Sequence, residues 1–230
     1  SIAAVGGNFR FLGGGAFWSN RIVYHWNKTV VEGLDVLDPI TRILDMSRIG
    51  PVLTFEDGAV RKGPPVTAML VQNTNPAVVA PDTNRVLKGL KRDDLFLCVH
   101  EQFLTETAQL ADIILPATMF LEHDDIYQAG GHMHLQIHRA VIEAPEQTRS
   151  NHWVINELAK RLGAQHPGFG MTEWELIDKT LLDSGWPSAD ALLEKKWHDV
   201  QPSFADSHFL NGFPTSTGRF QFSADWSKLG

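Results

Sequence analysis

Three short apolar runs that alternate with helical patterns constrain the fold of this chain more than any other feature. The runs Val66–Val71, Leu95–Val99 and Asp112–Leu115 are typical of strands buried on both faces. A helical pattern of apolar residues covers Pro81–Lys91, and a short helix is expected from about Glu106. Because strands and helices alternate through short links, the sequence predicts an α/β fold with a parallel sheet covered by helices.

Sequence signals on both sides of this predicted sheet indicate further elements. Asp38 as N-cap and Pro39 in the first turn predict a helix that ends at Gly50. The stretch Glu122–His138 carries two glycines and four histidines, and we expect it to be a loop. The parallel sheet is therefore expected to lie between a helix before it and a long polar loop after it.

The C-terminal part of the chain is predicted to be helical and then irregular. Asn151 can cap a helix over 152–162, and Gly163 can end it. The stretch Thr172–Glu175 has the pattern of a capping box for a second helix, and Ser188 can open a third. Glycines and prolines interrupt the last thirty residues, so we expect no long element there.

These patterns divide the chain into three parts. Residues 1–35 are a glycine-rich lead-in, whose glycines favour a structural loop over a phosphate loop because no G-K-[ST] follows them. Residues 36–165 are expected to form a Rossmann-like α/β domain with flanking helices. Residues 166–230 form a helical and irregular extension.

Composition excludes several classes of protein. The net charge of −7 without a Lys/Arg run makes a nucleic-acid partner improbable. The one cysteine, Cys98, excludes an internal disulfide and any site built from several local cysteines, and its place within a strand favours a buried packing role over a catalytic thiol. No apolar run reaches the length of about 20 residues that a membrane span needs, and no signal peptide is visible. A cytoplasmic location without membrane insertion is the default expectation.

Polar side chains follow the first two predicted strands at the point where each strand ends. The first strand leads into Gln72, Asn73, Thr74, Asn75 and Pro76, and the second into His100, Glu101, Gln102 and Thr105. The carboxyl ends of neighbouring parallel strands meet at one edge of a sheet, where open α/β sheets bind ligands. We therefore expect these two turns to lie side by side, with free helix N–H groups close to them.

The chemistry of these turns suits a nucleotide. Side-chain amides can bind a phosphate or a base edge, and helix N-termini favour phosphate oxygens. A carboxylate such as Glu101 can accept two parallel N–H bonds, as from the N1–H and the exocyclic amine of guanine. From the topology alone, ordinary capped turns without a ligand are an equally good interpretation.

A second cluster of polar residues lies in the histidine-rich stretch after the predicted sheet. Within sixteen residues it contains His123, Asp124, Asp125, His132, His134 and His138. Imidazole and carboxylate groups can bind zinc or iron, but this spacing matches no standard site, so surface or hydrogen-bonded histidines are the favoured interpretation. No metal-ligating residue is assigned.

Several motifs resemble the molybdopterin oxidoreductase family, in its dimethyl sulfoxide reductase and formate dehydrogenase type. They are the turn NTNPA, the run FLTETAQLADIILPA and the stretch YQAGG, with GGNFRFLGGG before them. The resemblance covers about residues 5–163, where NHWVINELAKRLG is similar to the closing helix of the family's domain. The ending GFPTSTGRFQF resembles the lead-in to the family's C-terminal barrel.

The resemblance implies a domain that binds the guanosine end of a molybdopterin guanine dinucleotide, in an enzyme that carries molybdenum or tungsten. The turn Asn73–Asn75, with Gln72 and Pro76 beside it, would lie near the phosphates and the sugar. Glu101 matches the family's acidic guanine-binding residue, which is often Asp. Thr105 matches a nearby hydroxyl ligand, and His100 would line the same pocket.

The chain also departs from the family pattern. It has no N-terminal iron–sulfur cysteines, no residue assignable as the Cys, selenocysteine or Ser that ligates the metal, and no C-terminal barrel. These departures suggest an internal or late segment of a catalytic subunit, inactive alone. Its partners would be the pterin cofactor, the other domains of the same enzyme and an electron-transfer subunit. Iron–sulfur clusters would belong to those other parts, and the full enzyme could be periplasmic.

Two other classes of protein remain open at this point. Respiratory-complex subunits that contain the same domain without molybdenum act as a structural scaffold, although such a scaffold has no need of an acid at Glu101 or a hydroxyl at Thr105. An ordinary NAD-binding domain is disfavoured because no G-x-G-x-x-G follows the first strand.

Overall fold

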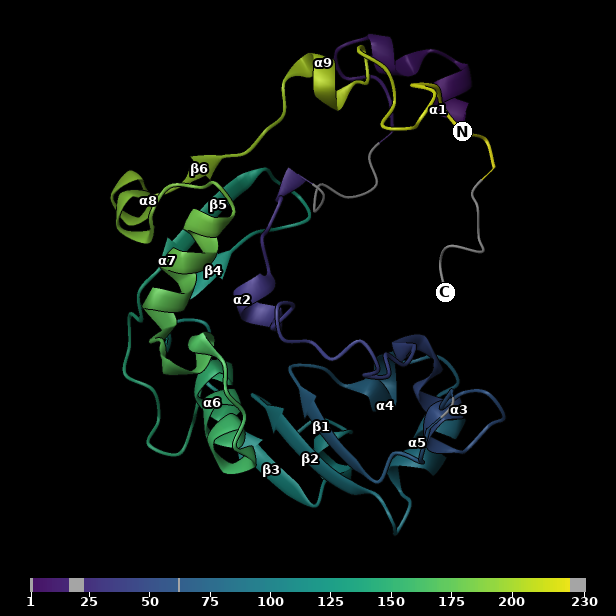
Figure 1. Ribbon diagram of the computed structural model, residues 1–230, viewed down its shortest axis with the longest axis vertical. Coiled ribbons are helices and arrows are strands. Elements are labelled where there is room, and N and C mark those ends of the chain that lie inside the picture. Colours follow the sequence, from purple (N-terminus) through teal and green to yellow (C-terminus); the bar gives the residue numbers. More distant parts are fainter. Residues whose placement is uncertain (1, 17–22, 62, 224–230) are drawn as a thin grey trace.

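The centre of the molecule is a three-stranded parallel sheet, as predicted. The computed structural model describes residues 2–16, 23–61 and 63–223. Strands β1 (Ala68–Gln72), β2 (Phe96–Glu101) and β3 (Ile113–Pro116) lie side by side in that order (Figure 1). The chain is therefore an α/β protein, and the carboxyl ends of all three strands meet at one edge of the sheet.

One face of this sheet packs against three helices. These are α3 (Ile49–Leu53), α4 (Pro76–Val79) and α5 (Thr83–Leu90). Leu53 and Val86 of the helices pack with Leu97 and Val99 of β2, and all four are almost fully buried. Each such side chain contributes about 1.5–3 kcal/mol relative to an exposed one. Gly89 lets α5 approach α3 closely, because a Cβ at this position would lie 2.4 Å from the Cβ of Leu53.

The predicted helix from Asp38 to Gly50 is wrong. The carboxylate of Asp38 accepts from the N–H of Ile40 (2.9 Å), and its carbonyl accepts from the N–H of Thr41 (2.9 Å), so Asp38 forms a turn. A short 3₁₀ helix, η3 (Met46–Arg48), precedes α3. Of the apolar residues of the predicted helix, Ile40 is 84% and Ile43 is 69% exposed, so little burial would stabilise that helix.

The predicted loop Glu122–His138 is also wrong in part, because it contains a hairpin. Strands β4 (Asp125–Tyr127) and β5 (His134–His138) pair antiparallel, and β6 (His198–Asp199) pairs with β5. Leu135 and Ile137 of β5 are buried, while His134, Gln136 and His138, which alternate with them, are partly exposed. The strand was not predicted because only two apolar residues alternate with polar ones, which is too short a pattern to indicate a strand.

The helices after the hairpin agree with the predicted pattern. They are α6 (Asn151–Leu162), α7 (Glu173–Asp183) and α8 (Ala189–Lys195). Ser150, not Asn151, caps α6, because its side chain accepts from the N–H of Trp153. Gly163 ends α6 with a positive φ of 70°, and both hydrogen bonds of the predicted capping box at Thr172 are present. Ser188 caps α8.

These elements form a second core that is separate from the first. It contains Tyr24, Leu135, Ile177, Leu181 and Leu192. Several short elements complete the described chain: α1 (Ile2–Val5), η1 (Asn8–Arg10), α2 (Thr29–Glu32), η4 (Ala108–Leu110), η5 (Pro167–Gly170) and α9 (Phe204–Ser207). No helix in the described ranges is long and apolar enough to cross a membrane. The predicted domain boundaries after residues 35 and 165 stay predictions.

Candidate functional site at the carboxyl edge of the sheet

The ends of β1 and β2 are joined by the fully buried side chain of His100. The Nδ1 atom of His100 lies 3.1 Å from Nε2 of Gln72, and its Nε2 atom lies 3.0 Å from the carbonyl oxygen of Arg149. Because a carbonyl only accepts, this arrangement places the ring proton on Nε2 and leaves Nδ1 to accept from the Gln72 amide. The N–H of Asn73 also donates to the carbonyl of His100 (3.2 Å). His100 and Gln72 therefore hold the two turns together.

A second link between the turns is made by Asn75 and Thr107. The side-chain oxygen of Asn75 accepts from the N–H (3.1 Å) and the hydroxyl (2.7 Å) of Thr107. Thr107 is buried, and its hydroxyl oxygen accepts from the N–H of Ala77 (3.0 Å). The amide of Asn75 donates to Glu106 (2.7 Å), and this hydrogen bond lowers the pKa of the Glu106 carboxyl. Thr107 was not among the predicted site residues, although it is the second threonine of the T-E-T motif.

The backbone N–H groups that were expected to face a ligand already donate to acceptors within the protein. The first N–H group of α4, that of Ala77, is bonded to Thr107, and Pro76 before it is buried and has none. The N–H of Val78 donates to the carbonyl of Asn75. At the start of η4, the N–H of Ala108 donates to the hydroxyl oxygen of Thr105 (3.2 Å). The expectation of free helix N–H groups beside the two turns is therefore wrong.

Three of the predicted residues keep polar groups at the surface of this edge. Glu101 ends β2 and is partly exposed, and one of its carboxylate oxygens accepts from the N–H of Gln102 (2.7 Å). Asn73 is exposed and has a positive φ of 52°, which places its side chain on a tight turn. Thr105 accepts through its hydroxyl oxygen, so its hydroxyl hydrogen can still donate.

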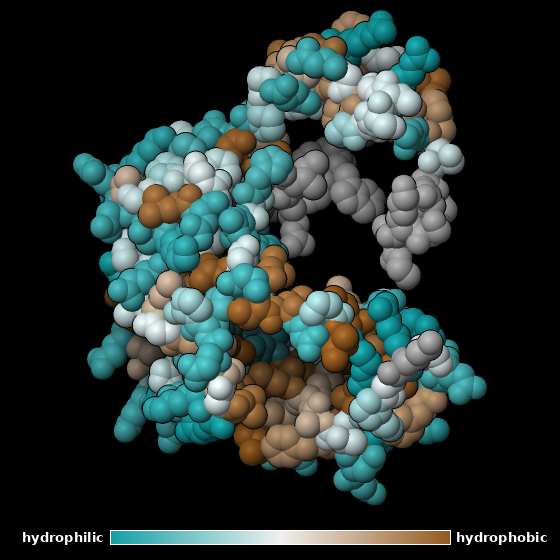
Figure 2. Space-filling model, in the orientation of Figure 1, coloured by the Kyte–Doolittle hydropathy of each residue, from teal (hydrophilic) through white to brown (hydrophobic). Residues whose placement is uncertain are grey.

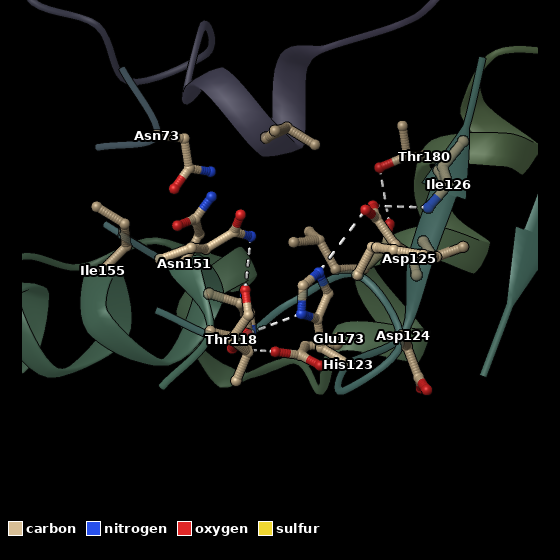
Figure 3. A pocket seen from close by; sticks show the side chains of 17 residues that line it. Asn73, Thr118, His123, Asp124, Asp125, Ile126, Asn151, Ile155, Glu173 and Thr180 are labelled. Carbon is tan, nitrogen blue, oxygen red and sulfur yellow. Dashed lines mark hydrogen bonds and ion pairs between the residues drawn. The ribbon is translucent and has the colours of Figure 1, made fainter. Parts of the chain in front are cut away.

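A cavity of about 480 Å³ opens beside this edge (Figure 3). Asn73, Gln102 and Thr118 line it from the three strand ends, and His123 and Asp125 line it from the segment that enters the hairpin. Helices α6 and α7 form most of the remaining wall, and Val31 of α2 and Phe120 also line it. Glu101 and Thr105 are not among the lining residues. The structure thus brings the strand-end turns and the histidine-rich stretch to one cavity, although they were considered separately from the sequence.

His123 is held between the sheet and the hairpin. Its Nδ1 atom lies 2.7 Å from the hydroxyl of the buried Thr118, and its Nε2 atom lies 3.7 Å from the carboxylate of Asp125. Asp125 raises the pKa of His123 above its ordinary value, and burial opposes this shift. His132 and His134 pack against aromatic rings, His132 on Tyr127 with 5.6 Å and His134 on Trp197 with 4.9 Å between ring centroids. The Nδ1 atom of His138 lies 3.2 Å from the carbonyl oxygen of Arg139.

The described residues contain no group of three His, Cys, Asp or Glu side chains placed to hold a metal ion. The histidine-rich stretch therefore supplies a titratable pair, His123 and Asp125, to the cavity wall.

Comparison with known proteins gives the class of this chain. Residues 52–161 match the family described as molybdopterin oxidoreductase, and the chain belongs to this family as a partial segment. Members of this family use a molybdopterin cofactor with molybdenum or tungsten. The matched residues include the whole parallel sheet and both strand-end turns.

The chain is similar to the probable oxidoreductase YoaE of Bacillus subtilis, with 39% identity over 163 residues that cover 70% of this chain and 23% of that protein. It is similar to the alpha subunit of the F420-dependent formate dehydrogenase of Methanocaldococcus jannaschii, with 34% identity over 48% of this chain and 16% of that protein. The acetylene hydratase from Pelobacter acetylenicus shares its fold, with a TM-score of 0.61 and 24% identity over 80% of this chain and 25% of that one. The match to this chain therefore spans a quarter or less of the length of each of these relatives.

Proposed function

We propose that the carboxyl edge of the parallel sheet binds the guanosine end of a molybdopterin guanine dinucleotide, in a molybdenum- or tungsten-dependent oxidoreductase of which this chain is one segment. The observation that carries the proposal is the pair of hydrogen bonds that links the carboxyl ends of β1 and β2. The hydrogen bonds of His100 to Gln72 and to Asn73 hold Asn73 and Glu101 at one edge of the sheet. An acid and an amide held in this way are preorganised for a ligand with several N–H groups.

The residues present fit the guanine end of this cofactor. Glu101 is partly exposed and spends one carboxylate oxygen on the adjacent N–H of Gln102, so its other oxygen remains to accept from a guanine. Thr105 can add a hydroxyl donor to the same ligand. Glu101 is one methylene longer than the Asp that is frequent in the family, which extends the carboxylate further from the strand end.

The contacts to the phosphates and the sugar fall to side chains instead of helix N–H groups. The backbone N–H groups at the start of α4 are bonded to Thr107 and Asn75. The exposed amide of Asn73 is thus a group of this turn that can donate to a phosphate oxygen. Gln72, Asn75, Pro76 and His100 act by holding the turn in place, because each is bonded within the protein or buried.

Bound molybdopterin would supply the metal and its two-electron chemistry, and this segment supplies binding and orientation. The whole enzyme would join it to the remaining domains of the same polypeptide and to an electron-transfer subunit. The chain alone is expected to be inactive, because none of its residues is assigned as the metal ligand.

The test is the substitution Glu101→Gln in the full-length enzyme. Loss of the charged hydrogen bonds should make the pterin dissociate about tenfold to a hundredfold faster. The measurement is the metal by mass spectrometry and the released pterin by fluorescence after dilution. Glu101→Asp should keep most of the retention, and Glu143→Gln, at an exposed loop position, is the matched control.

Unchanged retention in Glu101→Gln would contradict the guanine assignment. A full-length protein that contains neither metal nor pterin would instead favour the scaffold function, in which the same fold carries no molybdenum.

A further inference from the structure

One face of the parallel sheet changes from covered to open within a single strand. Side chains alternate along a strand, so Phe96, Cys98 and His100 of β2 share one face. His100 is fully buried, Cys98 is half-buried, and Phe96 is 49% exposed. A polar ring is thus buried and an aromatic ring is exposed on the same face, which is the reverse of what the hydrophobic effect favours.

The neighbouring strands extend this exposed region. In the sheet register Phe96 lies opposite Ala68, while Cys98 lies between Leu70 and Ile113. Leu70 is 36% exposed and Ile113 is 46% exposed. We call these five residues, Ala68, Leu70, Phe96, Cys98 and Ile113, the open face.

The opposite face of the sheet is closed at β1 and β2, although Ile114 of β3 is 43% exposed there. Val71, Leu97 and Val99 on that side are at most 2% exposed, because α3, α4 and α5 cover them. Figure 2 shows apolar side chains gathered over the lower part of the molecule, where Figure 1 places the sheet and α4. The five neighbouring residues of the open face form a contiguous apolar patch, and such a patch marks a contact surface.

On the side of the open face, the described residues cover the sheet only near the carboxyl ends of the strands. The next row, Gln72, His100 and Leu115, lies under the segment that leads into α6, where the carbonyl of Arg149 accepts from His100. Parallel sheets are covered by helices on both faces, since their crossover connections place helices there. The open face is therefore the part of this sheet whose cover is not contained in the described residues.

The kind of surface that packs on the open face can be inferred from its lack of charge and from the length of the related proteins. The open face has no charged side chain, so it offers no charge complementarity to an acidic or basic partner. The chain covers only 23% of YoaE and 33% of the related probable oxidoreductase YyaE of Bacillus subtilis. We propose that an apolar helix face from another part of the same polypeptide packs on the open face. This proposal rests on the sheet and not on the ligand, so it holds whether or not Glu101 binds guanine.

The thiol of Cys98 is a probe in the middle of the open face. Cys98 is the one cysteine of the sequence, so alkylation of its peptide by iodoacetamide can be followed by mass spectrometry. The rate should be lower by on the order of tenfold or more in the full-length protein than in the 230-residue chain, because covered groups react only through local opening. Equal rates would overturn the proposal. Protection that appears only as protein concentration rises would also overturn it, since a second copy would then be the cover.

A substitution provides the independent measurement. Phe96→Lys should leave the melting temperature of the 230-residue chain nearly unchanged, and it should lower that of the full-length protein by about 4–8 °C, because the lysine would be buried there. The control is Leu182→Lys, at a 54% exposed position on α7. Similar shifts in the two proteins would contradict the proposal. If the full-length variant does not accumulate, the alkylation rates of the unmodified proteins still decide.

Discussion

His100 and His123 are 23 residues apart in the sequence and lie in two regions that differ in burial. His100 is fully buried at the carboxyl edge of the sheet, and its two ring nitrogens are bonded to Gln72 and Arg149. His123 lies in the cavity wall, between Thr118 and the half-exposed Asp125. One histidine is a fixed structural link, and the other is a group that can change its charge.

The comparison shows how burial decides whether a histidine stabilises the fold or responds to pH. Both ring nitrogens of His100 are bonded to protein groups, so removing one partner leaves the buried ring short of a hydrogen bond. Around His123 solvent can replace a lost partner, and the raised pKa keeps the charged form accessible near neutral pH. The first region should therefore control stability, and the second should control its dependence on pH.

The largest expected effect is that of His100→Leu. Loss of the ring would leave the half-buried amide of Gln72 without its acceptor and remove one of the two donors to the carbonyl of Arg149, at a cost of about 2 kcal/mol in the free energy of unfolding. Urea unfolding followed by circular dichroism measures this value. His138→Leu, at a half-exposed position on β5, is the control and should cost much less. Equal losses in both variants would show that His100 is no more structural than a surface histidine.

A smaller effect is expected from Thr107→Val, which keeps the shape of the side chain and removes its hydroxyl. The N–H of Ala77 would lose its acceptor and Asn75 would lose one donor. We expect a loss of about 1.5 kcal/mol in the free energy of unfolding. The exposed Thr41→Val should change the same quantity by less than about 0.5 kcal/mol. If Thr107→Val were as mild as its control, the second link between the turns would be unimportant.

The fold and the site were predictable to different degrees. The three strands were found because their apolar runs are too short for helices and alternate with turns and helical patterns, and the observed bounds differ by one or two residues. The helix at Asp38 failed because its cap signal was real but its apolar residues, such as Ile40, are not buried. A capping pattern reports a local turn, and only tertiary packing decides whether a helix follows it.

Site residues were harder to predict because their roles depend on burial. The sequence places His100, Glu101 and Thr105 close together, and all three lie at the predicted edge. It does not show that the ring of His100 points into the protein, or that Thr107 does more for the turns than Thr105. Nor does it show that His123 reaches the same cavity as Asn73, since this contact depends on the unpredicted hairpin.

The smallest expected effect is the pH dependence of the pair formed by His123 and Asp125. The pKa of His123 is raised above 6.5 in the folded protein, so the stabilisation from this pair is fully present below pH 6.5 and is lost as pH rises through the raised value. Asp125→Asn should therefore lower the free energy of unfolding at pH 6 and leave it unchanged at pH 9. Because Asp125 is 52% exposed, solvent screening limits the loss at pH 6 to about 0.5 kcal/mol.

The matched control for this prediction is Asp93→Asn, at an exposed position away from any histidine of the cavity. It should show no difference between the two pH values. An NMR titration of the His123 ring gives the direct measurement, and its pKa should fall in Asp125→Asn because the carboxylate that raises it is gone. A ring that titrates at the same pH in both proteins would assign the shift to other groups. Glu122 and Glu173, which also raise the pKa of His123, would be the next to test.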